Sequence, residues 1–189
     1  MEWQTFQVIH ESPEQVADVE FWNKAKSTYD RFKKFRSEVI EAALFVENTL
    51  TNILLDFFSY PSAQRRALLR GLIFDAEFCT FFQKWKLLRQ LVDLYGTELG
   101  IEQNELKSLK KELHQVISLR NRFAHGTIYV DARDFSVWIE YIEGTKQRDK
   151  IIEGELSNTT EMCDRIHGQL YEIHKVIESL EYKLPDIKT

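Results

Sequence analysis

Apolar residues recur at three- and four-residue steps along most of the chain, which is the periodicity of an amphipathic helix. Gly and Pro are scarce, at seven and three of 189 residues, so the chain lacks the breakers that a fold of many turns needs. A chain of this length can bury one well-formed core, and 43% apolar with 29% charged residues is ordinary for a globular protein. The periodicity therefore predicts a mainly α-helical protein with a single domain over residues 1–189.

Five helices are expected from the periodic stretches and their start and stop residues. They cover about residues 13–57 with a break near Asp30, 62–71, 80–96, 103–125 and 158–180. Between the last two helices, residues 127–130, 135–143 and 150–155 are rich in Ile, Val, Tyr and Trp, which favour strands. The sequence therefore predicts a bundle of about five helices, with a small antiparallel β-hairpin or meander inserted at about residues 127–155.

Composition also indicates which cellular compartment and which kinds of site are expected. Two cysteines, Cys79 and Cys163, are too few for a disulfide framework and favour a reducing, cytoplasmic compartment. No basic stretch followed by an apolar run opens the chain, and no segment approaches about eighteen apolar residues, so neither a signal peptide nor a membrane span is expected. No cluster of His, Cys and carboxylates has ligand spacing, so neither a metal nor a cofactor is expected.

The helix expected to end at His125 carries an arginine where its apolar stripe predicts a leucine. With Arg120 at the origin and about 100° per residue, Leu113, Val116 and Ala124 fall within about 40° of it. A charge on that stripe requires a partner, a wet cavity or a ligand, because burying a lone charge is strongly unfavourable. Arg120 is therefore a candidate functional residue.

His125 lies about 140° from Arg120 on the same wheel, so the two side chains do not share a face. It stacks instead over Asn121, one turn earlier, with His114 on the same side of the helix. Cations in the last turn of a helix also interact well with the negative end of its dipole. That structural interpretation accounts for Arg122 and His125 but not for an arginine on the stripe, so both interpretations of the pair stay open.

The segment Leu119-Arg120-Asn121-Arg122-Phe123-Ala124-His125-Gly126 resembles the signature of HEPN-superfamily domains, in which an Arg, usually followed by a polar residue, is separated from a His by four to six residues near a helix end. Segments 41–58 and 78–88 are similar to further parts of such domains. The resemblance implies a mostly helical domain, commonly a homodimer whose motif helices face each other. In many members it implies a metal-independent endoribonuclease of toxin–antitoxin, anti-phage or RNA-processing systems; in others it implies a non-catalytic module.

These residue types suit RNA cleavage without a metal, in which the 2′-hydroxyl attacks the neighbouring phosphate. His125 would move the proton near neutral pH. Arg120 would hold the phosphate and stabilise its developing charge. Asn121 would orient His125 or contact a phosphate. The expected partners are RNA, a second copy of the chain, and a cognate antitoxin or other protein.

Glu47 is the second residue out of place, because apolar residues three and four positions away share its stripe. One hypothesis is that Glu47 faces inward and pairs with Arg120 or its neighbourhood, with Arg122 and His114 as further supporting residues. The alternative is a carboxylate exposed at the edge of the stripe.

Two basic segments, 33–36 and 64–66 with Arg70, could touch RNA phosphates, although solvated helix faces fit the same pattern. The leading hypothesis is a dimeric HEPN ribonuclease. The alternative is a non-catalytic HEPN module that binds a nucleotide, nucleic acid or a protein partner. The net charge of −5 favours the alternative, whereas the intact Arg-Asn-x3-His segment favours the ribonuclease.

Overall fold

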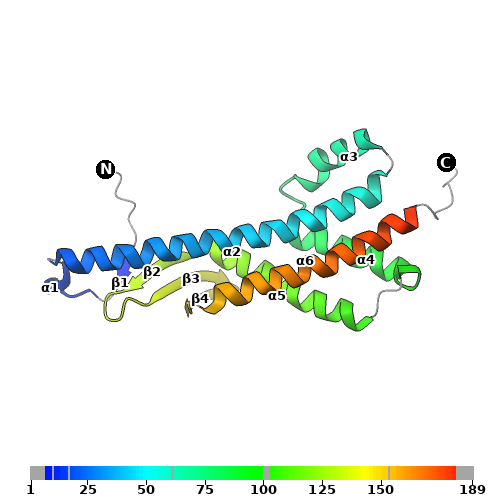
Figure 1. Cartoon of the computed structure of the whole chain (residues 1–189). Helices are drawn as coiled ribbons and strands as arrows, with labels where there is room; N and C mark the ends of the chain where they lie inside the picture. Colours follow the sequence, from blue (N-terminus) through cyan, green and yellow to red (C-terminus); the bar gives the residue numbers. More distant parts are fainter. Residues whose placement is uncertain are drawn as a thin grey trace. The chain divides into compact units, whose positions relative to one another are not determined.

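A computed structural model describes residues 7–9, 11–16, 18–60, 62–99, 103–152 and 154–181. The elements follow the order β1 (Gln7–Ile9), α1 (Pro13–Val16), α2 (Val19–Ser59), α3 (Ala63–Leu69), the π-helix η1 (Arg70–Phe74), α4 (Phe81–Leu99), α5 (Gln103–His125), β2 (Thr127–Asp131), β3 (Val137–Glu143), β4 (Thr145–Lys150) and α6 (Gly154–Glu181). The described chain is thus mainly helical, with a small sheet before the last helix (Figure 1). This confirms the predicted fold class.

The chain divides into two compact units. Unit 1 comprises residues 1–41 and 118–160, and unit 2 comprises residues 42–117 and 161–189. Helices α2, α5 and α6 each contribute residues to both units. The single domain expected over residues 1–189 stays a prediction.

Unit 1 is built on a sheet with the strand order β1-β2-β3-β4, in which β1 runs parallel to β2 and the other pairs are antiparallel. Alternate residues of a strand point to opposite faces. Ile128 and Ile139 accordingly share one face and form a buried cluster with Phe32 and Val39 of α2 and Phe123 of α5. The sheet is therefore held on the helices by one apolar face.

The regular secondary structure of unit 2 is entirely helical over its described residues, with a turn at residues 75–80 before α4. Its fully buried apolar side chains come from the later part of α2, from α4, from the earlier part of α5, and from α6: they include Val46, Leu50, Ile53, Leu88, Leu113, Ile166 and Leu170. Their three- and four-residue spacing confirms the helical stripes. Across the described residues, no helix combines the length and the apolarity that crossing a bilayer requires.

Several helix ends follow their predicted signals. The Thr80 amide donates to Gln83 Oε1 at 2.7 Å, and the Gln83 amide donates to Thr80 Oγ1 at 3.4 Å, which is a capping box. Ser62 caps α3 by accepting from the Arg65 amide at 3.2 Å. Helix α5 has its predicted bounds.

Four predictions for the helices were wrong. The helix expected to run on from residue 13 is interrupted, because α1 ends at Val16, Asp18 is not helical and α2 begins at Val19. Helix α2 has no break at Asp30, because buried apolar residues continue on both sides of that exposed position. Helix α4 passes through Gly96 to Leu99, since one glycine disfavours a helix by only about 1 kcal/mol. Helix α6 begins at Gly154, so the cap residues expected from Asn158 onward lie inside it.

Two strands differ from the prediction. The third strand was expected at residues 150–155, but β4 spans Thr145–Lys150 and follows a turn at Gly144, whose φ is +70°. Each β4 residue is polar or charged, so the sequence of this segment resembles that of a turn. Such a composition is compatible with a strand at the edge of a sheet, because an edge strand needs no buried face. Strand β1 was not predicted, because a three-residue strand depends on its distant partner β2 rather than on its own pattern.

Gly126 connects α5 directly to β2, and its surroundings leave no room for a side chain. A Cβ there would lie 2.5 Å from the Arg122 carbonyl oxygen and 2.6 Å from Ile139 Cγ1. Gly126→Ala is therefore expected to lower the free energy of unfolding by about 1–3 kcal/mol, measured by urea denaturation. Gly168→Ala in α6 is the matched control, because a Cβ there would have no neighbour within 4 Å and Ala favours a helix. Equal losses in the two variants would contradict this account of Gly126.

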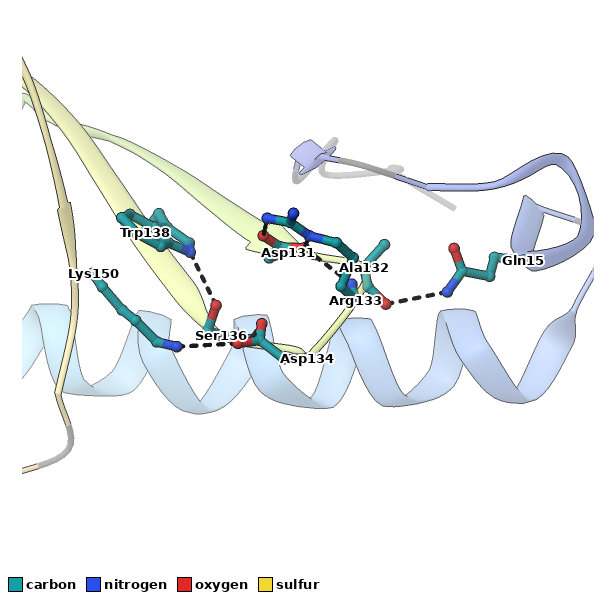
Figure 2. Close-up of polar contacts among 8 residues, drawn as sticks. All are labelled: Gln15, Asp131, Ala132, Arg133, Asp134, Ser136, Trp138 and Lys150. Atoms are coloured by element: carbon teal, nitrogen blue, oxygen red, sulfur yellow. Dashed lines mark hydrogen bonds and ion pairs between the residues drawn. The ribbon is translucent and has the colours of Figure 1, made fainter.

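The turn between β2 and β3 predicts a pH dependence (Figure 2). Hydrogen bonds from Ser136, followed by one from Lys150, lower the pKa of Asp134 from 3.8 to about 2. Because the pKa of Asp134 is lowered by folding, its ionised carboxylate stabilises the folded state when the pH is above the ordinary pKa of 3.8. This contribution disappears as the pH falls toward about 2. We expect Asp134→Asn to flatten the loss of stability between about pH 4 and pH 2, measured by urea denaturation at each pH. An unchanged slope would contradict this role.

Candidate functional site

The predicted motif occupies the last turns of α5, in unit 1, where two contacts fix the helix end. The Gly126 amide donates to the Arg122 carbonyl oxygen at 2.8 Å, and Arg36 Nη2 of α2 donates to the Ala124 carbonyl oxygen at 2.9 Å. The last carbonyls of a helix have no intrahelical donors, so both contacts satisfy groups that need one. Sequence reasoning placed Arg36 only in a basic segment and missed this role, which the unsatisfied carbonyls could have suggested.

Arg120 is half-buried, and its Nη1 donates to Asn121 Oδ1 at 3.1 Å. Its Nε is buried and has no hydrogen-bond acceptor among the described residues. The helical wheel put Arg120 at the centre of the apolar stripe, but in unit 1 the fully buried Phe123 holds that place. Arg120 lies about 60° round from Phe123, at the edge of the stripe, because α5 packs against the sheet on the Phe123 side.

His125 and Asn121 are both exposed, as expected of two residues one turn apart on a polar side of the helix. Within the described part of unit 1, the His125 imidazole has no hydrogen bond, ion pair or ring contact. The structure thus brings Arg120 and Asn121 together and leaves His125 open to solvent. An exposed imidazole beside a fixed helix end is accessible to a ligand.

Arg122 has a structural role. Its side chain is 14% exposed, and Nη1 lies 3.1 Å from Asp149 Oδ2, which also accepts from the Tyr141 hydroxyl at 2.8 Å. The guanidinium lies 5.0 Å from the ring centroid of Phe123 and 5.8 Å from that of Tyr141. The hydrogen bond to Asp149, together with burial, raises the pKa of Tyr141. Arg122 therefore fastens the end of α5 to β3 and β4.

Glu47 belongs to unit 2, where Lys84 Nζ donates to its Oε1 at 2.8 Å. The side chains of Glu47 and Lys84 are 15% and 8% exposed, so Glu47 faces inward as predicted. Its partner Lys84 was missed, although Lys84 also interrupts an apolar stripe, with Leu88 and Leu91 four and seven residues later. The pairing expected between Glu47 and Arg120 would join the two units and stays a prediction.

The remaining predicted polar residues of unit 2 have protein neighbours. His114 is exposed, with its ring edge-on to Phe82 at 5.4 Å between centroids. In the second basic segment, Arg66 pairs with Asp56, and Arg66 and Arg70 donate to Asn52 Oδ1 at 3.2 and 2.7 Å. These contacts favour a structural role for the two arginines. Among the residues described, no three His, Cys, Asp or Glu side chains gather as a metal site would need.

The interaction between Glu47 and Lys84 can be measured with a double-mutant cycle. Glu47→Leu leaves Lys84 buried without its counter-charge, and we expect a loss of about 3–5 kcal/mol in the free energy of unfolding. Replacing both residues, as Glu47→Leu with Lys84→Met, should cost much less, because no unpaired charge remains. Urea denaturation of the two single variants and the double variant measures the coupling. Additive losses would show that the two side chains do not interact.

No protein-family model, no curated protein and no solved structure matches this chain. Function is therefore inferred from the residues at the end of α5 and from their chemistry.

Proposed function

We propose that this chain is a cytoplasmic, metal-independent endoribonuclease of HEPN type, with Arg120, Asn121 and His125 in its active site. The observation that carries the proposal is the end of α5, where a half-buried arginine donates to Asn121 and an exposed histidine lies one turn after Asn121. The buried Nε of Arg120 has no acceptor among the described residues, so the guanidinium retains a donor for a ligand. A phosphate oxygen would satisfy that donor.

The chemistry follows from the three side chains. The 2′-oxygen of a ribose forms a bond to the adjacent phosphorus, and the bond from phosphorus to the 5′-oxygen of the next nucleotide breaks. The 2′-hydroxyl loses a proton and the departing 5′-oxygen gains one. His125 moves one of these protons, because an imidazole can act as a general acid or a general base. Arg120, with Nη1 held by Asn121, stabilises the charge that builds on the phosphate oxygens. The products are a 2′,3′-cyclic phosphate and a 5′-hydroxyl.

A second copy of the chain completes the site in this proposal. His125 follows Arg120 by five positions, and this spacing sets them about 140° apart on the helix. One phosphate is therefore reached less readily by both side chains of one helix than by Arg120 of one copy and His125 of another. A two-fold axis between the ends of two α5 helices would create two such composite sites.

The first test is cleavage of single-stranded RNA by the purified protein in excess EDTA. We expect 2′,3′-cyclic phosphate ends, and a fall of about 10²–10⁴ in rate for His125→Ala with an unchanged melting temperature. Lys110→Ala, an exposed substitution on the same helix, is the matched control and should retain full rate. Cleavage that persists in His125→Ala would point to a contaminating nuclease and sink the proposal.

The second test separates a composite site from a single-chain site. Arg120→Ala and His125→Ala are each expected to be inactive alone. If each site combines two copies, mixed dimers hold one intact site, and an equal mixture should recover about a quarter of the wild-type rate. An inactive mixture in which subunit exchange has been verified would exclude the composite arrangement.

The second candidate function is a non-catalytic module that binds a nucleotide, nucleic acid or a protein such as an antitoxin. The net charge of −5 favours it, because a nuclease that grips long RNA benefits from more positive charge. Binding of RNA without any cleavage would move the conclusion to this alternative.

A further inference from the structure

A groove of about 400 Å³ lies in unit 1, between the earlier part of α2 and the adjoining ends of β3 and β4. Its volume is within the range of small-molecule sites. The side chains that matter to its chemistry are Arg31, Lys34, Phe35, Glu38, Phe135 and Lys150. No residue of α5 lines it, so it is a different place from the Arg120–His125 site.

The charges around this groove are mostly positive. Three cations line it against one carboxylate, Glu38, although the chain as a whole carries a net charge of −5. Glu38 is 3.8 Å from Lys34 Nζ in an exposed pair, which is a weak interaction. Lys150 Nζ reaches Asp134 Oδ2 at 3.1 Å, with 49% of its side chain still exposed (Figure 2). The lining is thus suited to an anion.

Phenyl rings supply the apolar part of the lining. Phe35 and Phe135 are both half-buried, and Phe32 of the core cluster, whose ring centroid lies 5.3 Å from that of Phe35, also lines the groove. Phe135 has a φ of +55°, a conformation that a bulky side chain rarely adopts. Its amide donates to the Asp131 carbonyl oxygen at 2.8 Å, and Phe21 packs against its ring with centroids 5.5 Å apart.

The backbone of Phe135 is strained by its positive φ. A positive φ at a non-glycine residue disfavours the folded state by about 1–3 kcal/mol, and glycine or asparagine would make the same turn with less strain. The ring is also held by Lys24, whose Nζ lies 4.4 Å from its centroid. An aromatic side chain kept in a strained turn, on the wall of a cationic groove, is the arrangement expected of a ligand contact.

We propose that this groove binds a nucleotide unit. The base would lie against the rings of Phe35 and Phe135, and the phosphate would be held by Lys34 and Lys150, with Arg31 as the third cation. Base stacking on aromatic rings and phosphate binding by cations are the two contacts that nucleotides use most generally. The unit can be a free mononucleotide or one nucleotide of an RNA strand. The proposal goes beyond RNA cleavage and holds whether or not the chain is a nuclease.

The test is isothermal titration calorimetry on the full chain carrying His125→Ala, so that no RNA is consumed. The probes are AMP, adenosine, inorganic phosphate and a five-nucleotide single-stranded RNA. We expect saturable binding of AMP or of the RNA, with adenosine and phosphate each weaker than AMP. Lys34→Gln with Lys150→Gln should weaken binding by at least about tenfold, because the two charge-assisted contacts are lost.

Two further variants test the role of the Phe135 ring and control for the loss of a lysine charge. Phe135→Asn removes the ring but tolerates a positive φ, so relief of strain offsets part of the packing lost with Phe21, and the variant should weaken binding while it stays folded. Lys26→Gln changes an exposed lysine of the same helix that does not line the groove, and should alter the affinity less than about twofold. RNA binding without AMP binding would identify the ligand as a nucleotide of a strand.

The proposal is overturned if neither AMP nor the RNA binds saturably. It is also overturned if binding survives the Lys34/Lys150 and Phe135 variants unchanged. Cleavage is scored separately in the chain with His125 intact, so failure of the groove and failure of the proposed nuclease are distinguishable.

Discussion

The arrangement of unit 1 depends on how closely β3 approaches the end of α5. Only a hydrogen atom fits between the Gly126 backbone, the Arg122 carbonyl and the Ile139 side chain, so the chain leaves the helix and enters β2 within one residue. That abrupt change sets which face of β2 points inward, because strand residues alternate. Ile128 then joins the cluster around Phe123, and His125 stays outside as the last residue of the helix. The close approach at Gly126 thus sets the buried face of the sheet, whereas the exposure of His125 follows from the helix period.

The helices could be predicted from the sequence because their information is local. Helix α5 has its predicted bounds, since a regular apolar spacing is followed at once by a glycine. Strands β1 and β4 were missed or misplaced because their evidence lies elsewhere in the chain. Strand β1 exists through its pairing with β2, and β4 is an edge strand whose charged side chains need no buried face.

The candidate site shows the same division between local and distant information. That His125 and Asn121 lie together on a polar face follows from the helix period, and their exposure agrees with it. The Arg36 contact with the Ala124 carbonyl joins residues 88 positions apart, and the Lys84 contact with Glu47 joins residues 37 positions apart. A break in an apolar stripe indicated that Glu47 needs a partner, but only the packing of α2 with α4 in unit 2 identifies that partner.

The charged edge of the sheet has a consequence for how copies of the chain can meet. Lys146, Arg148 and Lys150 alternate along β4 and therefore point to one face. Two such strands laid antiparallel about Arg148 would set lysine opposite lysine and arginine opposite arginine, which like-charge repulsion disfavours. Addition of another molecule's β4 in this register is therefore disfavoured, to the extent that Glu140, which pairs with Lys146 and Arg148, leaves the repulsion uncompensated. The charged edge thus weakens strand-to-strand aggregation at β4.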